Sequence, residues 1–360
     1  MSQQDEIWRD LGSFNPDMLI LARNAAGLGQ MKLGSLLKVG QNTISRWESG
    51  ARCPSEDEVN TFSGLFGRPA SFFYQPHVLG DSDNDVLFHR KKASTGKLVL
   101  KRLHARLSVA RVALTQFLSS IETWNVTVPR IPVQSIGDGA MVAKRVRAAW
   151  NVPPGPIRDL FQLVEAAGVV VFRFDFGCRE IDAIGVWPSQ SLPLMFVNAA
   201  SPTDRARFSV AHELAHLVMH SQPTSTMEEE ADQFAGEFLF PTASAQTELQ
   251  GVSTSTIWRA KQRWRVSGQA ILRAALRAGT INENRYQSIM CYFSKQGWRR
   301  DEPYPLDPET PNTLRKIVDA FRNELGYSTD QIRTLTGLTS MEMSLLFGID
   351  ERVSKVSIDL

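Results

Sequence analysis

Apolar residues recur mostly at helical spacing along the chain, and one stretch in its middle departs from that pattern. Short apolar runs at 168–174, 181–186 and 194–198 are bounded by turn-forming residues and predict three β-strands. Helical spacing before them, at 140–150 and 157–168, predicts two helices. The pattern therefore predicts a mainly α-helical protein with a small β-sheet, an α+β fold.

A buried helix after the strands carries chemically active side chains. Residues 208–218 are mostly apolar but include His212, Glu213 and His216. Histidines at this spacing share one face of a helix and can bind one zinc ion, and the adjacent glutamate can accept a proton from a water that the metal activates. The alternative is a chance pattern in a core helix, although two unpaired histidines would be costly there.

The next amphipathic helix begins with acidic residues and ends at Pro241. A catalytic zinc takes three protein ligands and keeps one open position, so we predict Glu228 as the third ligand. Asp232, one turn further on, is predicted to orient a ligand. The other acids, Glu229 and Glu230, suit only the positive end of the helix dipole, and that is also the alternative reading for Glu228.

Residues 1–76 have the pattern of a compact set of short helices. Helices at 30–37 and 41–48 are joined by a tight turn, and Gly50 ends the second. Their core spacing involves Leu33, Leu36, Leu37, Val39, Ile44 and Trp47. The second helix would expose polar side chains suited to a DNA major groove, namely Gln41, Asn42, Thr43, Ser45 and Arg46.

A basic segment at 77–138 follows. An acidic, turn-prone linker at 80–85 precedes eight lysines and arginines, with no acid, between His89 and Arg111. The apolar side of a long helix runs through 98–118. These cations either bind DNA phosphates or lie on the solvated face of a connecting or dimerising helix.

The predicted third and fourth regions are 139–300, which holds the strands and the histidines, and 301–360 at the C-terminus. Within 254–279 there are basic residues and no acid, in a helix, a turn capped by Ser267 and another helix. This pair either offers a second nucleic-acid surface or packs on the preceding domain. A Pro-rich acidic linker at 299–311 leads to further C-terminal helices.

Composition limits the protein class. With 360 residues, two or three domains are expected, and a net charge of +2 with 42% hydrophobic residues is ordinary for a globular protein. No apolar run is long enough to span a membrane, the N-terminus is polar, and three scattered cysteines predict no disulfide framework. We therefore expect a cytoplasmic protein without a membrane partner.

The stretch GLGQMKLGSLLKVGQNTISRWESGARCPS resembles the Xre and phage-repressor helix-turn-helix family. The resemblance implies a double-stranded DNA operator as partner, with Gln30 on a phosphate and Gln41, Asn42 and Arg46 facing bases. The sequence departs from the family at Gly34, where alanine is usual, and at Lys38, where glycine is usual. A helical protein-interaction module is the alternative.

Residues 141–298 resemble the ImmA/IrrE (DUF955) zinc metallopeptidases through RFSVAHELAH and through ExxADxFA starting at Glu228. The resemblance implies a zincin-like domain with His212, His216 and Glu228 as metal ligands and Glu213 as general base. Zinc is the expected cofactor, with manganese as the other candidate. Asp232 replaces a more usual asparagine, and we read His220, where the family often has histidine, as structural.

These patterns lead to one main hypothesis about function. The main hypothesis is a DNA-binding transcription regulator fused to a gluzincin-like zinc metalloendopeptidase. The peptidase would cleave a repressor, another regulator or itself after a stress or mobile-element signal. We expect a homodimer. The first alternative is a ligand-sensing repressor whose peptidase-like domain binds metal without proteolysis, and the second is a protein-binding adaptor.

Overall fold

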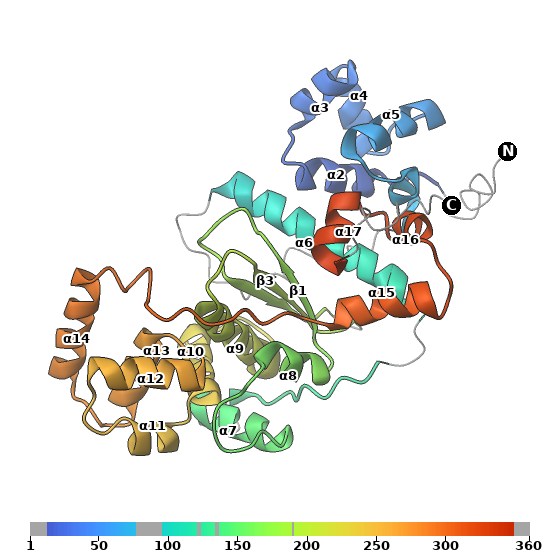
Figure 1. Ribbon diagram of the computed structural model, residues 1–360. Coiled ribbons are helices and arrows are strands. Elements are labelled where there is room, and N and C mark those ends of the chain that lie inside the picture. The colour runs from blue at the N-terminus through green and yellow to red at the C-terminus, as the bar shows by residue number, and fades with distance from the viewer. Residues whose placement is uncertain (1–12, 77–95, 121–123, 134–136, 189–190, 349–360) are drawn as a thin grey trace, which may run out of the picture.

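The computed structural model describes residues 13–76, 96–120, 124–133, 137–188 and 191–348. The predicted acidic linker at 80–85 and the start of the basic run lie outside these residues. A small sheet lies at the centre, with helices on both of its faces (Figure 1). This confirms the predicted mainly helical α+β fold.

The sheet has three strands in the order β1-β3-β2. They are β1 (Val170–Phe174), β2 (Ala183–Val186) and β3 (Leu194–Asn198), and all three were predicted. β1 pairs parallel with β3, whereas β2 pairs antiparallel with it, with Gly185 opposite Met195. β2 is therefore an edge strand, and it packs against the helix that carries the histidines, α9 (Thr203–Met219).

The first hydrophobic core lies on the α9 face of the sheet. Val171, Met195 and Val197 point into it and meet apolar residues of the surrounding helices. Those helices are α7 (Gly139–Ala149), α8 (Leu160–Ala166), α9 and α10 (Met227–Leu239), followed by α11 (Thr242–Glu248), α12 (Thr254–Trp264), α13 (Gly268–Arg277) and α14 (Glu283–Lys295). The last four helices form the end of the molecule farthest from the N-terminal domain (Figure 1).

The second core lies on the opposite face of the sheet, where Phe172 and Phe196 stack at 5.0 Å between ring centroids. The predicted long basic helix, α6 (Lys97–Leu118), is part of this core. Its Arg106 donates to the carbonyl of Asp175 and so serves the fold. Exposed cations of the described part of α6 lie near its N-terminal end, at Lys97, Lys101 and Arg102.

The N-terminal domain consists of α2 (Pro16–Ala25), α3 (Gln30–Leu37), α4 (Gln41–Glu48), α5 (Glu56–Phe66) and the 3₁₀ helix η1 (Ala70–Tyr74). The bounds predicted for α3 and α4 are confirmed. The core role predicted for Leu36 is wrong, because its side chain is 44% exposed. The eight-residue α3 has a narrow buried side that consists of Leu33 and Gly34.

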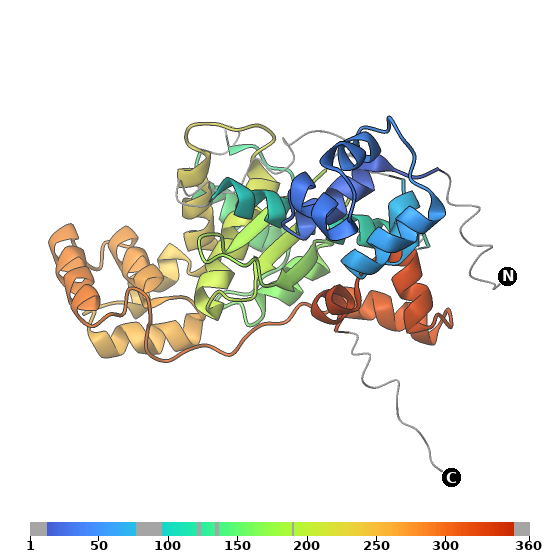
Figure 2. The same ribbon diagram turned by 90° about the horizontal axis from the view of Figure 1, so that it is seen from above.

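The C-terminal helices repeat the layout of α3 and α4. After α15 (Thr313–Asn323), helices α16 (Thr329–Thr336) and α17 (Ser340–Phe347) each have eight residues, as α3 and α4 do. The residue after the first helix of each pair is left-handed, Lys38 at φ 57° and Gly337 at φ 71°. The outer side of α17, however, presents Met341 and Leu345, which are 73% and 53% exposed. This unit lies directly against the N-terminal domain (Figure 2).

The segment predicted as a linker at 299–311 is attached to the sheet-containing domain by buried ionic contacts. Glu302 accepts a hydrogen bond from Lys261 at 2.9 Å, and the buried Glu309 pairs with the buried Arg207 of α9. The segment crosses the molecule from α14 to α15 (Figure 1). No helix within the described ranges is long and apolar enough to cross a bilayer.

Candidate metal centre and nucleic-acid interface

Two packed helices, α9 and α10, bring the candidate ligands together. The first turn of α10 is held in place by α7, which approaches it closely at Gly139. A Cβ atom at Gly139 would lie 2.0 Å from the carbonyl oxygen of Glu230, so only glycine permits this approach. The close packing of α7 thus fixes the acidic turn of α10 against α9.

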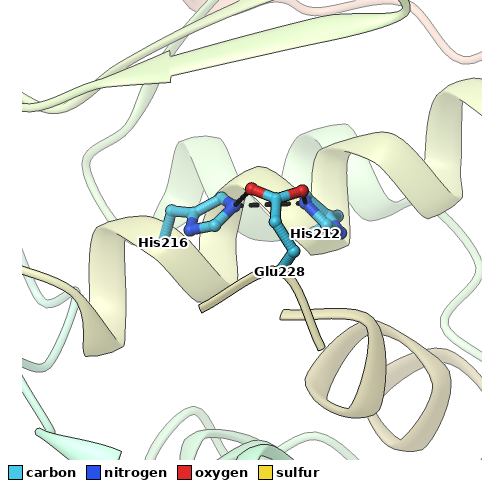
Figure 3. A group of neighbouring side chains, drawn as sticks. All are labelled: His212, His216 and Glu228. Atoms are coloured by element: carbon cyan, nitrogen blue, oxygen red, sulfur yellow. Dashed lines mark hydrogen bonds and ion pairs between the residues drawn. The ribbon is translucent and has the colours of Figure 1, made fainter. Parts of the chain in front are cut away.

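Side chains of His212, His216 and Glu228 converge on one point between these helices (Figure 3). The two Nε2 atoms are 3.1 Å apart. The Glu228 carboxylate lies 3.6 Å from Nε2 of His212 and 3.5 Å from Nε2 of His216. Ligands about 2.0–2.2 Å from one tetrahedral zinc would be separated by roughly 3.3 Å. The spacing of these atoms therefore fits a single zinc-sized cation.

The imidazoles of His212 and His216 are each oriented by a group that lies within hydrogen-bond distance of Nδ1, the ring nitrogen that does not face the metal site. Nδ1 of His212 lies 2.9 Å from the carboxylate of Asp232. Nδ1 of His216 lies 2.9 Å from Nδ1 of His220, whose Nε2 lies 2.9 Å from the carboxylate of Glu230. The sequence predicted the orienting role of Asp232 but gave Glu230 only a helix-dipole role. The contact of Glu230 with His220 corrects this second prediction.

This arrangement also determines where the imidazole protons lie. When Nε2 of His220 donates to Glu230, its Nδ1 accepts the Nδ1 proton of His216. A carboxylate likewise accepts the Nδ1 proton of His212. Both neutral imidazoles then direct an Nε2 lone pair at the same point, beside a Glu228 oxygen that is buried without a hydrogen-bond partner. Such a cluster of acceptors calls for a cation.

The pKa values of His212, His216 and Glu228 also indicate a site that favours a positive charge. Burial alone would lower the pKa of His212, but the neighbouring carboxylates of Asp232 and Glu228 outweigh burial and raise the pKa to about 9. The neighbouring imidazoles of His212 and His216 hold the pKa of Glu228 well below its usual range. Burial lowers the pKa of His216. The cluster therefore stabilises a proton where a metal would otherwise supply the charge.

Glu213 lies beside the edge strand of the sheet. Its Oε2 accepts the backbone N–H of Gly185 on β2 at 2.7 Å, and the residue is 5% exposed. Burial raises the pKa of Glu213 to about 8. A Cβ atom at Gly185 would lie 3.1 Å from the same carboxylate oxygen, so glycine leaves room for it.

The candidate nucleic-acid interface is the outer side of α4. Glu48, the last residue of α4, joins this helix to α2 and α3 by accepting hydrogen bonds from Arg23 at 2.9 Å and from Gln30 at 2.8 Å. Gln30 also accepts from Gln41 at 3.5 Å. The side chains predicted to face DNA lie together on α4, with Thr43 half-buried and the others exposed, namely Gln41, Asn42, Ser45 and Arg46.

The second predicted basic surface, at 254–279, serves the fold to a large extent. Lys261 is buried and donates to Asp204 at 2.7 Å. Arg265 donates to the carbonyl of Asp307, and Arg277 donates to the carbonyls of Gly236 and Phe240. These contacts favour packing over DNA binding for this helix pair.

Comparison with known proteins identifies both parts of the chain. No curated protein matches it. A family model described as helix-turn-helix matches residues 19–73, and a peptidase family model described as IrrE N-terminal-like domain matches residues 164–275. The second match spans the histidines, Glu213, Glu228 and Asp232. The chain therefore joins a helix-turn-helix DNA-binding domain of the Xre type to a peptidase-like domain of the IrrE/ImmA type.

Proposed function

We propose that this protein is a DNA-binding transcription regulator whose second domain is a metal-dependent endopeptidase acting on a regulator protein. The observation that carries the proposal is the convergence of His212, His216 and Glu228 beside the buried Glu213. Stress or the activity of a mobile element is the proposed signal. The substrate is another repressor or this chain itself.

We propose His212, His216 and Glu228 as the ligands of a divalent metal, zinc first and manganese second. When bound, the metal would act as a Lewis acid on a peptide carbonyl and lower the pKa of a water molecule. Asp232 orients His212, and the pair His220 and Glu230 orients His216. These three are positioning residues, because they act through the ligands.

Glu213 is the proposed general base. Burial raises the pKa of the Glu213 carboxyl toward neutrality, so the carboxylate can accept a proton from a water molecule and later release it to a leaving amine. The hydrogen bond from Gly185 fixes one oxygen of Glu213. The other oxygen remains available for proton transfer.

The proposed substrate is an extended protein segment added to the free edge of β2. The backbone N–H of Asn198 donates to the carbonyl of Asp182, so Asp182 is a hydrogen-bonded partner of β3. In an antiparallel pair every second residue is bonded in this way, and the residues between, including Gly185, direct their N–H and carbonyl groups away from β3. Strand addition at such an edge uses main-chain hydrogen bonds and suits a protein substrate. The N–H of Gly185 is already bonded to Glu213, so a substrate would pair with the neighbouring backbone groups of this edge, next to the proposed base.

The DNA-binding domain is proposed to contact an operator through α4, with Gln30 on a phosphate. Arg46, Gln41 and Asn42 would face base edges, and Thr43 and Ser45 would lie beside them. Operators of this class of motif commonly have two half-sites, so we propose that a homodimer binds.

The test uses the purified full chain with zinc or manganese, alone and with candidate helix-turn-helix repressors as substrates. Intact mass spectrometry follows cleavage, and elemental analysis follows bound metal. Wild-type protein is compared with Glu213→Gln and with Glu283→Gln, an exposed acid on α14 that serves as matched control. Cleavage by the wild type and the control, but not by Glu213→Gln, supports the proposal.

Two other results would change the conclusion. Bound metal without cleavage of any candidate would leave a DNA-binding regulator whose peptidase-like domain only binds metal. Absence of bound metal in the wild type, equal to that in His212→Ala, would refute the hydrolase.

A further inference from the structure

A cavity of about 630 Å³ begins at the candidate metal centre and extends between α10 and α13. Glu228 and Asp232 lie in its wall, so the cavity shares one proposed ligand and one ligand-orienting residue with the centre. Phe208, one helical turn before His212 on α9, also lines it. The cavity therefore continues from the metal centre along the same face of α9.

The inner wall of the cavity is apolar. Side chains from four helices and the α12–α13 turn contribute to it, namely Phe208, Ala235, Leu239, Val266, Leu276 and Tyr286. A site with this volume holds a ligand larger than one small side chain. Burying an apolar group here removes it from water, which favours bulky aliphatic or aromatic side chains.

Two arginines on α13 lie in the wall, and their contacts differ. Arg277 donates to Thr242 Oγ1 at 3.0 Å and to the carbonyl of Phe240 at 3.0 Å, so it is used by the fold. Arg273 is exposed, and within the described part of the chain it has no hydrogen-bond or ion-pair partner. Its guanidinium is therefore available to a carboxylate, which it can bind with two parallel hydrogen bonds.

We propose that this cavity is the specificity pocket of the peptidase and selects a bulky apolar residue next to the scissile bond, followed by an acidic residue held by Arg273. This proposal rests on the proposed function, because a scissile bond is meaningful only if the centre binds metal. The apolar wall and Arg273 together distinguish this substrate class from basic or small-residue sequences. A free amphipathic acid is the other ligand to which such a pocket could respond, and the test separates the two.

The experiment measures binding without turnover, in zinc-loaded full chain that carries Glu213→Gln. The probes are fluorescent peptide hydroxamates, in which the chelating group anchors one end at the metal. The first residue is Phe, Leu or Gly, and the second is Glu, Gln or Lys. Dissociation constants are measured by fluorescence anisotropy after the zinc content has been checked. Decanoate serves as the probe for a free amphipathic acid.

Matched variants test each wall. Arg273→Glu removes the proposed carboxylate site, and Arg259→Glu makes the same charge change on an exposed α12 residue outside the cavity. Ala270→Phe fills the cavity from α13. We expect Phe to bind about 10- to 100-fold more tightly than Gly, from the burial of one large apolar side chain. We expect Glu to exceed Lys about tenfold, a preference that Arg273→Glu reverses and Arg259→Glu keeps.

Equal binding of the Phe and Gly probes would overturn the proposal, as would equal effects of the two arginine variants. Tight decanoate binding that displaces the hydroxamates and is lost in Ala270→Phe, with no preference between the Phe and Gly probes, would assign the cavity to a free amphipathic acid and also overturn it. Failure of the proposed function gives a different result. If the wild type cleaves nothing while these binding preferences hold, the peptidase activity is refuted and the binding pocket is still supported. If the chain holds no zinc, the same peptides without hydroxamate measure the preferences for side chains directly.

Discussion

Replacing Arg68 by alanine tests how the C-terminal helices are held on the DNA-binding domain. Arg68 lies after α5, and it donates to the carbonyl of Gly337 at 3.0 Å and to Glu342 at 2.6 Å. Its guanidinium also lies 4.5 Å from the ring centre of Phe72. One side chain therefore joins α5 and η1 to both α16 and α17.

The expected loss follows from burial. The side chain of Arg68 is 4% exposed and that of Glu342 is 22% exposed. Removing one partner of a buried ion pair costs about 3–5 kcal/mol, and the lower end applies here because Glu342 can regain contact with water. We therefore expect Arg68→Ala to weaken docking of the C-terminal helices by about 3 kcal/mol.

The chain contains a matched control in Arg52. Arg52 also pairs with a glutamate at 2.6 Å, Glu58, and lies 5.6 Å from the ring centre of Trp47. Its side chain is 41% exposed, so Arg52→Ala should cost about 1 kcal/mol or less.

Native-state hydrogen exchange in α16 measures the docking free energy of the C-terminal helices. A loss of about 3 kcal/mol corresponds to roughly 100-fold faster exchange in Arg68→Ala. Chemical denaturation shows whether the rest of the chain follows. A difference between the two variants of less than about 1 kcal/mol would contradict the burial argument.

Three further variants, one of them with a control, test single contacts. Gly139→Ala forces a Cβ atom against Glu230, so it should destabilise the protein by about 3 kcal/mol in urea denaturation and weaken zinc binding. The control is Gly64→Ala on α5, where the added Cβ meets open space and should stabilise the protein by up to about 1 kcal/mol. Lys38 has a φ of 57°, a left-handed conformation that favours glycine, so Lys38→Gly should raise the free energy of unfolding by about 1 kcal/mol. An unchanged free energy of unfolding would mean that contacts of the lysine side chain offset the cost of this conformation. His220→Ala should lower zinc affinity about 10- to 100-fold in chelator competition, and unaltered affinity would remove its positioning role. Because His220 is buried and hydrogen-bonded, the same substitution should also cost about 1–3 kcal/mol of stability.

Much of the fold could be predicted because its determinants are local. The bounds of α3 and α4 follow from helical spacing, the flanking glycines and a short turn, all within a few residues. Strand β3 was predicted with its observed bounds because a buried apolar run between turns leaves few alternatives. Leu36 was misplaced because spacing identifies a helix face but not how much of a short helix is covered.

In the candidate site, too, local features could be predicted from the sequence and tertiary contacts could not. Spacing on one helix and the family motif predict the convergence of His212, His216 and Glu228. The contact of His220 with Glu230 depends on the way α10 crosses α9, and an acidic first turn is equally well explained by the helix dipole. The close approach at Gly139 is also a tertiary feature, since the glycine has an ordinary helical environment in sequence.

The predicted linker at 299–311 packs against the domain that it leaves and so gives the two domains a physical connection. Its acids Glu302 and Glu309 pair with Lys261 and with Arg207 of α9, and Lys261 also binds Asp204 at the start of α9. Because these partners are far apart in sequence, an acidic, Pro-rich composition alone resembles a solvated connection. The segment continues into the helices that contact the DNA-binding domain. One stretch of chain therefore carries the buried pair of Arg207 and Glu309 at one end and the pair of Arg68 and Glu342 at the other. Loss of the Glu309 carboxylate would leave Arg207 buried and unpaired, which loosens the base of α9 and the anchor of the C-terminal helices together.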